Sequence, residues 1–203
     1  IMNLTASNEG QKSFAGDIPL LPFIHQKGGL CIGQGLCQLL TTDDLVAMFY
    51  LFRLPQGWHP LFAFDMQLDG SELGLTAGVT YWMASAVIPM GWVNATGVAQ
   101  YLMRQFTLRV NQYAPTCLSP HAEIRRDLIL PRLYALPKHG REMAAWMVYI
   151  DGLDIDEIIE VSNASWMSAS GRCVEQDLFK QAVEEVGGTL HDKKSESRVL
   201  TSR

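Results

Sequence analysis

The sequence predicts a domain of the α+β class, in which antiparallel strands are backed by helices. Two stretches rich in aromatic and apolar residues, 61–65 and 73–87, are typical of a pair of strands. A later apolar stretch ends at Asp151-Gly152, a dipeptide that is favoured in two-residue hairpin turns. Between them, Asn94 can cap a helix along which apolar residues recur at helical spacing. Strand pairs and helices in one short chain indicate the α+β class.

The composition is that of a folded protein with one domain. The 203 residues (22.6 kDa) are 48% hydrophobic and 18% charged, which excludes intrinsic disorder and leaves enough apolar side chains for a core. The four cysteines are too few and too scattered for a disulfide framework, so we expect an intracellular location, in the cytoplasm or the nucleus, and no secretion. The chain opens on Ile1, which indicates a piece of a longer protein.

Charge is distributed unevenly along the chain. The net charge of -5 excludes a globally basic protein that coats nucleic acid. Seven arginines and lysines nevertheless fall within residues 104–141, and an acidic run at 151–160 follows directly. A positive stretch beside clustered carboxylates suits an anionic polymer together with metal ions, whereas a solvated charged face is the alternative.

The first part of the chain, residues 1–40, is rich in glycine and proline and predicts loops with short strands. The glycine-rich run at 28–35 lacks the Gly-Lys-Ser/Thr of a phosphate-binding loop, so a plain loop is the better interpretation. His25 precedes Cys31 and Cys37, but no second pair of ligands follows at the spacing of a zinc site.

A short helical turn is expected after residue 41. Thr42 and Asp43 can cap it, because short polar side chains accept hydrogen bonds from the first free amides of a helix. The apolar residues that follow recur at helical spacing: Leu45, Met48, Phe49 and Phe52.

The middle of the chain continues with the strand pair, joined by a turn at Asp69-Gly70, and with the helix that runs to Phe106. Residues 111–140 carry four prolines and predict mostly loop. A membrane span is the alternative interpretation of residues 73–103, which carry no charged side chain. Prolines and glycines interrupt that stretch and no positive cluster flanks it, so a buried strand and helix explain it better and we expect no membrane partner.

Two acidic positions are candidates for metal binding. Asp151 would lie at the exposed end of a buried strand, where a divalent cation can reach a carboxylate on a rigid support. Asp43-Asp44 follows an apolar segment far away in the sequence. Two carboxylates from distant segments are what a two-metal phosphoryl-transfer site needs. A plain hairpin turn and a helix cap are the alternatives.

Taken in order, four segments resemble the palm of reverse transcriptases, particularly those of retrotransposon polyproteins. They are Asp44-Leu-Val-Ala-Met-Phe-Tyr-Leu-Phe-Arg-Leu-Pro55, the Pro-x-Gly motif and helix at 88–100, Tyr149-Ile-Asp-Gly152, and the helix, glycines and lysines at 179–194. The resemblance implies a reverse-transcriptase-like palm at 41–203, an antiparallel sheet backed by helices. It also implies an insertion at about 107–142, a partial fingers segment at 1–40 and no thumb.

The resemblance also implies the roles of individual residues. Asp44 and Asp151 would be the catalytic metal ligands for two Mg²⁺ ions, with Mn²⁺ as the alternative ion. The remaining positions would contact the substrate: Phe49 as the gate that excludes a ribose 2′-hydroxyl, Met90 and Gly91 beside the nascent base pair, and Lys193 or Lys194 near the triphosphate.

Three positions depart from the pattern of that family. Met90 stands where many relatives have Gln, and Thr96-Gly97 replaces the frequent Ser-Pro or Ala-Pro. Gly152 replaces the second Asp of Tyr-x-Asp-Asp, which removes one negative charge from beside the metals. Asp154 could compensate only if the hairpin bulges.

The function that follows from the resemblance is RNA-directed DNA polymerase activity. A primer 3′-hydroxyl would attack the α-phosphate of a deoxynucleotide, and two metal ions would assist. The expected partners are an RNA or DNA template with its primer, dNTP, and other polyprotein domains such as a thumb, an RNase H and an integrase. A degenerate palm that at most binds nucleic acid is the second interpretation, and an integral membrane or lipid-associated fragment is the third.

Overall fold

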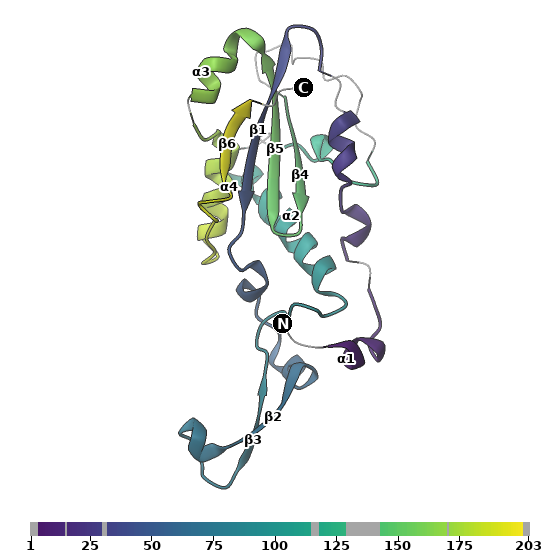
Figure 1. The fold of residues 1–203 in the computed structure, drawn as a ribbon, viewed down its shortest axis with the longest axis vertical. Coiled ribbons are helices and arrows are strands. Elements are labelled where there is room, and N and C mark those ends of the chain that lie inside the picture. The colour runs from purple at the N-terminus through teal and green to yellow at the C-terminus, as the bar shows by residue number, and fades with distance from the viewer. Residues whose placement is uncertain are drawn as a thin grey trace. The chain divides into compact units, whose positions relative to one another are not determined.

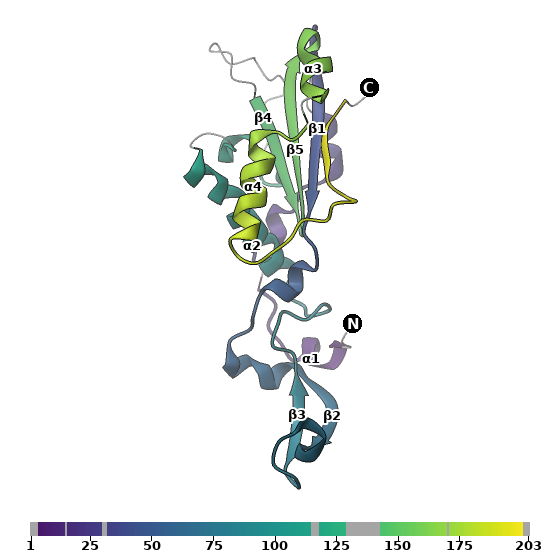
Figure 2. The ribbon, with the colours of Figure 1, turned by 90° about the vertical axis from the view of Figure 1, so that its left-hand side faces the viewer.

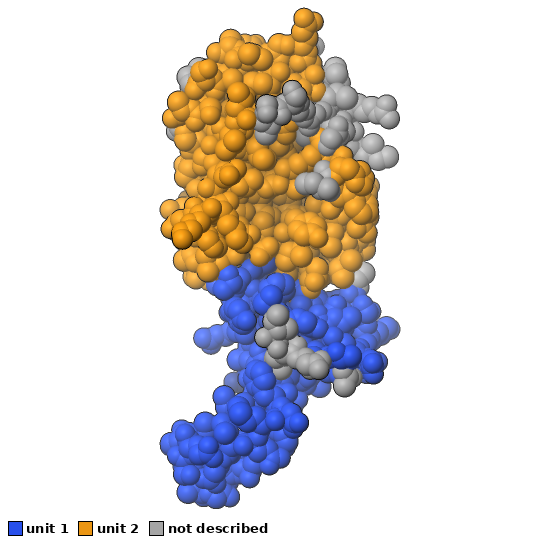
Figure 3. Space-filling model, in the orientation of Figure 1, with its two compact units in different colours: residues 1–14, 47–95 blue, residues 15–46, 96–203 orange. Residues whose placement is uncertain are grey.

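The computed structural model describes residues 4–14, 16–29, 32–114, 118–128, 143–169 and 171–200. The chain forms two compact units, coloured separately in Figure 3. Unit 1 comprises residues 1–14 and 47–95, and unit 2 comprises residues 15–46 and 96–203. Both contain antiparallel strands together with helical segments, so the predicted α+β class is confirmed.

Unit 2 is built on a four-stranded antiparallel sheet with the strand order β4-β5-β1-β6 (Figure 1). Strand β5, Gly152–Glu160, lies in the middle and pairs with β4, Met143–Tyr149, on one side and with β1, Leu36–Asp44, on the other. Strand β6, Glu196–Leu200, pairs with the free edge of β1. Strand β5 is paired with β1 along its whole length and with β4 from Gly152 to Ile158, so it is the most constrained strand of the sheet.

The two faces of this sheet follow from the alternation of side chains along each strand. One face is an apolar core, to which neighbouring strands contribute fully buried Leu39, Trp146 and Ile155. Helices α2, Ala95–Tyr113, and α4, Val174–Glu184, lie on the same side of the sheet (Figures 1 and 2). On the opposite face, Ile124 packs in a smaller buried cluster: Ala145, Met147 and Ile158.

The sequence of α2 explains its position. The predicted helix after Asn94 is confirmed, and it extends beyond Phe106 to Tyr113. Its fully buried residues recur every three or four positions, as expected for one face of a helix: Ala99, Met103, Thr107 and Val110. The much shorter α3, Ala164–Ala169, contributes to a buried cluster with β1 and β5. Within the described residues, no helix is both long and apolar enough to cross a membrane.

Unit 1 holds α1, Thr5–Glu9, and the predicted strand pair. The strands are β2, Ala63–Asp69, and β3, Thr80–Ala84, so their bounds differ from those expected. Asp69 caps a single 3₁₀ turn, Gly70–Leu73, through a capping box with Glu72, and the connection is therefore longer than a direct hairpin turn. The rings of Phe14, Trp58 and Phe62 surround Trp92 edge-on at centroid distances of 6.0, 6.1 and 5.5 Å.

Two local predictions were wrong. Thr42 and Asp43 do not cap a helical turn, because the pairing of β1 with β5 holds them in a strand that continues to Asp44. The helical turn comes later, at Met48–Leu51, after Ala47 in the left-handed region. Within residues 1–40, the described part is more regular than expected and contains α1, two 3₁₀ segments and most of β1. Cys31 and part of the expected insertion, 115–117 and 129–142, lie outside the described residues.

Candidate functional site

The structure brings Asp44 and Asp151 together at one end of the sheet. Asp44 is the last residue of β1, and its partner across the ladder is Gly152, the first residue of β5. The amide of Leu45 donates to the carbonyl of Asp151 at 2.9 Å, which ties the backbone after Asp44 to the hairpin. The register of β1 and β5 therefore brings two acidic residues from distant parts of the chain to the same end of the sheet, where the charge of Asp44 acts on Asp151.

The hairpin that carries Asp151 turns one residue earlier than the sequence predicts. Tyr149 pairs with Gly152, so the two turn residues are Ile150 and Asp151. Ile150 has a φ of 57°, in the left-handed region that is costly for a β-branched residue. Gly152 is a strand residue and is not among the residues with positive φ. The interpretation of Asp151-Gly152 as the turn dipeptide was thus wrong, and the strain lies at Ile150.

A single lysine neutralises part of the charge of the two aspartates. The ammonium of Lys194 lies 2.7 Å from Oδ2 of Asp44. Burial, followed by the charge of Asp44, raises the pKa of Asp151, and Lys194 opposes this rise. The hydrogen bond and the charge of Asp44 raise the pKa of Lys194. The charge of Asp44 thus disfavours ionisation of Asp151, and a further positive charge bound between the two carboxylates would favour it.

The sequence did not show whether Lys193 or Lys194 belongs to the site, and the structure distinguishes the two. Lys194 lies in a turn in which its amide donates to the carbonyl of His191 at 2.9 Å. The amide of His191 donates to the carbonyl of Asp44 at 2.8 Å, and the hydroxyl of Thr42 donates to the carbonyl of Lys194. These bonds hold the turn against the end of β1. Lys194 faces Asp44, whereas the side chain of Lys193 is exposed.

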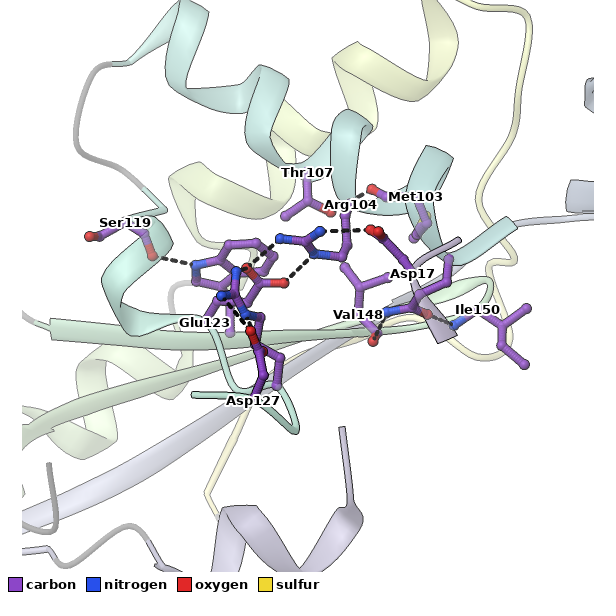
Figure 4. A network of polar contacts seen from close by, with 12 residues as sticks. Asp17, Met103, Arg104, Thr107, Ser119, Glu123, Asp127, Val148 and Ile150 are labelled. Atoms are coloured by element: carbon purple, nitrogen blue, oxygen red, sulfur yellow. Dashed lines mark hydrogen bonds and ion pairs between the residues drawn. The ribbon is translucent and has the colours of Figure 1, made fainter. Parts of the chain in front are cut away.

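Gln100 of α2 positions the hairpin turn, and the sequence did not identify it. Its two partners in the turn, Val148 and Ile150, are labelled in Figure 4. Its side-chain amide donates to the carbonyl of Val148 at 2.9 Å, and its side-chain carbonyl accepts from the amide of Ile150 at 2.8 Å. Gln100 is 1% exposed, so these groups have no access to solvent. The sequence did contain a signal for this role: Gln100 directly follows Ala99 on the apolar face of the helix, where a polar side chain needs a buried hydrogen-bond partner.

We expect Gln100→Leu to lower the free energy of unfolding by about 2 kcal/mol, because it leaves a buried amide and a buried carbonyl of the turn without partners. Urea unfolding measures the loss. Gln105→Leu is the matched control, since Gln105 lies on the same helix and is exposed, and it should change stability by no more than about 0.5 kcal/mol. Equal losses in the two variants would show that the hydrogen bonds of Gln100 do not hold the turn.

Asp154 does not replace the missing second aspartate. The registers of β5 with β1 and with β4 are continuous, so no bulge moves Asp154 toward the turn. Its carboxylate instead binds the ammonium of Lys27 at 2.7 Å, and the same ammonium lies 3.4 Å from Asp156. The amide of Gln38 also donates to Asp156. One ammonium thus offsets part of the charge of this pair of carboxylates within unit 2.

The predicted positive stretch is largely paired in the structure. Arg104 and Arg125 bind Glu123, and Arg109 binds Glu185 at 3.1 Å. The guanidinium of Arg126 lies over the ring of Phe23, 4.1 Å from its centroid. The other basic residues of the stretch, Arg132, Lys138 and Arg141, lie outside the described residues. The described part of the stretch is therefore better explained by internal ion pairs than by an open basic face.

The donors present fit a magnesium site. Within the described ranges, no group of three or more histidines, cysteines or acidic residues gathers around one point. Asp44 and Asp151 nevertheless offer two carboxylates, and Asp44 keeps 19% of its side chain exposed. Mg²⁺ is usually held by one or two carboxylates together with water and substrate phosphates, so a pair is sufficient.

The predicted substrate residues Phe49, Met90 and Gly91 belong to unit 1, whereas the two aspartates belong to unit 2. Phe49 is half-buried in the turn Met48–Leu51, and Met90 is 40% exposed. Gly91 has a φ of 101° in a turn closed by the amide of Trp92 and the carbonyl of Pro89, a conformation that requires glycine. Their roles in substrate binding stay predictions.

Comparison with known proteins does not assign the chain to a family. No protein-family model matches it, and no curated protein does so either. The motifs and the geometry of Asp44, Asp151 and Lys194 are the observations that bear on its function.

Proposed function

We propose that the chain is a reverse-transcriptase palm, part of an RNA-directed DNA polymerase of a retroelement. The observation that carries the proposal is the meeting of Asp44 and Asp151 at one end of an antiparallel sheet, with Lys194 beside them. The order of the motifs supports it, since each of the three residues falls in a segment that resembles a palm motif.

In this proposal, the residues of unit 2 bind and orient the reactants for nucleotidyl transfer. Asp44 and Asp151 hold the divalent ions, which when bound activate the primer 3′-hydroxyl and stabilise the negative charge of the departing pyrophosphate. Lys194 binds phosphate oxygens of the dNTP as a positive charge on a flexible stem. Gln100 holds the hairpin, so that Asp151 stays in register with Asp44.

The residues of unit 1 have the roles that the resemblance implies. Phe49 limits the space at the sugar 2′ position, which distinguishes deoxynucleotides from ribonucleotides. The turn at Met90-Gly91 brings backbone close to the nascent base pair, because a glycine presents no side chain.

Extension of a primed RNA template tests the proposal. A labelled DNA primer annealed to RNA is incubated with dNTP and Mg²⁺ or Mn²⁺, and we expect slow, metal-dependent addition of nucleotides. Salt-sensitive binding of the primer-template without any extension would contradict a polymerase and favour the second function, a degenerate palm that only binds nucleic acid.

Gly152→Asp is expected to strengthen Mn²⁺ binding about tenfold, since it adds a third negative charge beside the pair. Position 152 lies directly opposite Asp44 across the ladder, so the two side chains share a face of the sheet. A Cβ there would meet its nearest atoms, the carbonyl oxygens of Tyr149 and Asp43, at 3.7 and 3.8 Å, and no positive φ opposes the substitution.

Calorimetric titration with Mn²⁺ measures this effect, with Gly152→Asn as the control of similar size and no charge. Equal affinities in the wild type, the Asp variant and the Asn variant would show that position 152 does not face bound metal.

A further inference from the structure

Lys194 stands where a metal ion would have to approach Asp44. Its ammonium is 2.7 Å from Oδ2 of Asp44, the carboxylate proposed to bind a divalent cation. The positive charge of Lys194 also acts on Asp151, the second proposed ligand. A divalent ion held by both aspartates would be close to this ammonium, and the two like charges would repel each other.

The backbone of Lys194 is anchored independently of its side chain, so the ammonium can move away from Asp44 while the backbone stays at the end of the sheet. Three hydrogen bonds hold the turn: His191 to Asp44, Lys194 to His191, and Thr42 to Lys194. All three involve the backbone of the turn and none involves the ammonium. The side chain of Lys194 is 59% exposed, whereas that of Asp44 is 19% exposed. An ion pair this open to solvent is weak, so a divalent ion can displace it at little cost.

We propose that Lys194 is an exchangeable counter-ion of the metal site. In the metal-free protein its ammonium neutralises Asp44, and a bound divalent cation replaces it. The displaced ammonium, still tethered at the same end of the sheet, is then available to an anionic ligand such as a polyphosphate. Because coupling between sites is reciprocal, cation and polyphosphate favour each other's binding through this one side chain. The inference rests on the proposed metal site.

Calorimetric titration with Mn²⁺ tests the exchange in the wild type and in two matched variants. Lys194→Met removes the competing ammonium and should bind Mn²⁺ about three- to tenfold more tightly. Lys193→Met removes the same charge from the neighbouring exposed lysine and should bind it as the wild type does. Unchanged or weaker binding by Lys194→Met, or equal tightening in both variants, would overturn the exchange.

A second measurement follows the lysine directly. The Lys194 side-chain NMR signal, assigned by its loss in Lys194→Met, should move toward the position of a free lysine as Mg²⁺ is added. If the signal did not move while Mg²⁺ binds, the exchange would be wrong, but the proposal of a metal site would still hold. Absence of Mn²⁺ binding in all three proteins would instead overturn the metal site, and the exchange with it.

Discussion

Asp44→Asn and Asp151→Asn are each expected to lower metal-dependent primer extension by about 100-fold or more, because each removes half of the negative charge that would hold the ions. The two residues lie together only through the pairing of β1 with β5. Asn keeps the size of the side chain and can still accept a hydrogen bond, so the loss reports on charge and not on shape.

The stability of Asp151→Asn separates lost catalysis from lost folding. Burial and the charge of Asp44 raise the pKa of Asp151. A carboxyl whose pKa is raised on folding stabilises the fold only while it is protonated, and that contribution is lost as the pH rises through the raised pKa. Above that pKa the ionised Asp151 costs stability, so the Asn variant should there be as stable as the wild type or slightly more so.

Primer extension and urea unfolding are measured on both variants. Asp192→Asn is the control, because Asp192 is an exposed carboxylate in the same turn as Lys194. It should retain activity within about threefold of the wild type, as expected for a surface charge. Equal activities for the Asp44, Asp151 and Asp192 variants would contradict the assignment of the metal ligands.

Arg104→Ala should lower the free energy of unfolding by about 3–5 kcal/mol, the largest effect on stability that we expect in this chain. Arg104 is 8% exposed, and its guanidinium binds both carboxylate oxygens of Glu123 and the carboxylate of Asp17 (Figure 4). The side chain of Glu123 is 2% exposed, so the substitution leaves a buried negative charge without its main partner.

Arg109→Ala is the matched control for this prediction. Arg109 lies on the same helix and pairs with Glu185, but the two side chains are 39% and 37% exposed. Such a pair contributes about 0–1 kcal/mol. Urea unfolding at neutral pH compares the two variants. If Arg104→Ala lost no more stability than Arg109→Ala, the buried network would not hold residues 16–29 and 118–128 against α2.

Local sequence signals were sufficient for the hairpin of β4 and β5, the helix after Asn94 and the α+β class. Each signal comes from residues close together in the chain. The hairpin is indicated by an apolar run that ends at a turn, and the helix by a capping residue that precedes a stretch with helical periodicity. The same signals placed the hairpin turn one residue late, because Asp-Gly favours a turn wherever it occurs. The pairing of Tyr149 with Gly152 moved the turn to Ile150-Asp151 against the preference of Ile150.

From the sequence alone, three candidates for one site could be predicted: Asp44, Asp151 and a lysine after the last predicted helix. Three features are visible only in the folded chain: Asp44 and Asp151 lie at the same end of the sheet, Lys194 and not Lys193 faces Asp44, and Gln100 holds the turn. They could not be predicted because of the range of the interactions. Side-chain alternation and capping act over a few residues, whereas strand register and buried hydrogen bonds join segments far apart in the chain, and shifting a register by one residue moves every side chain to the other face.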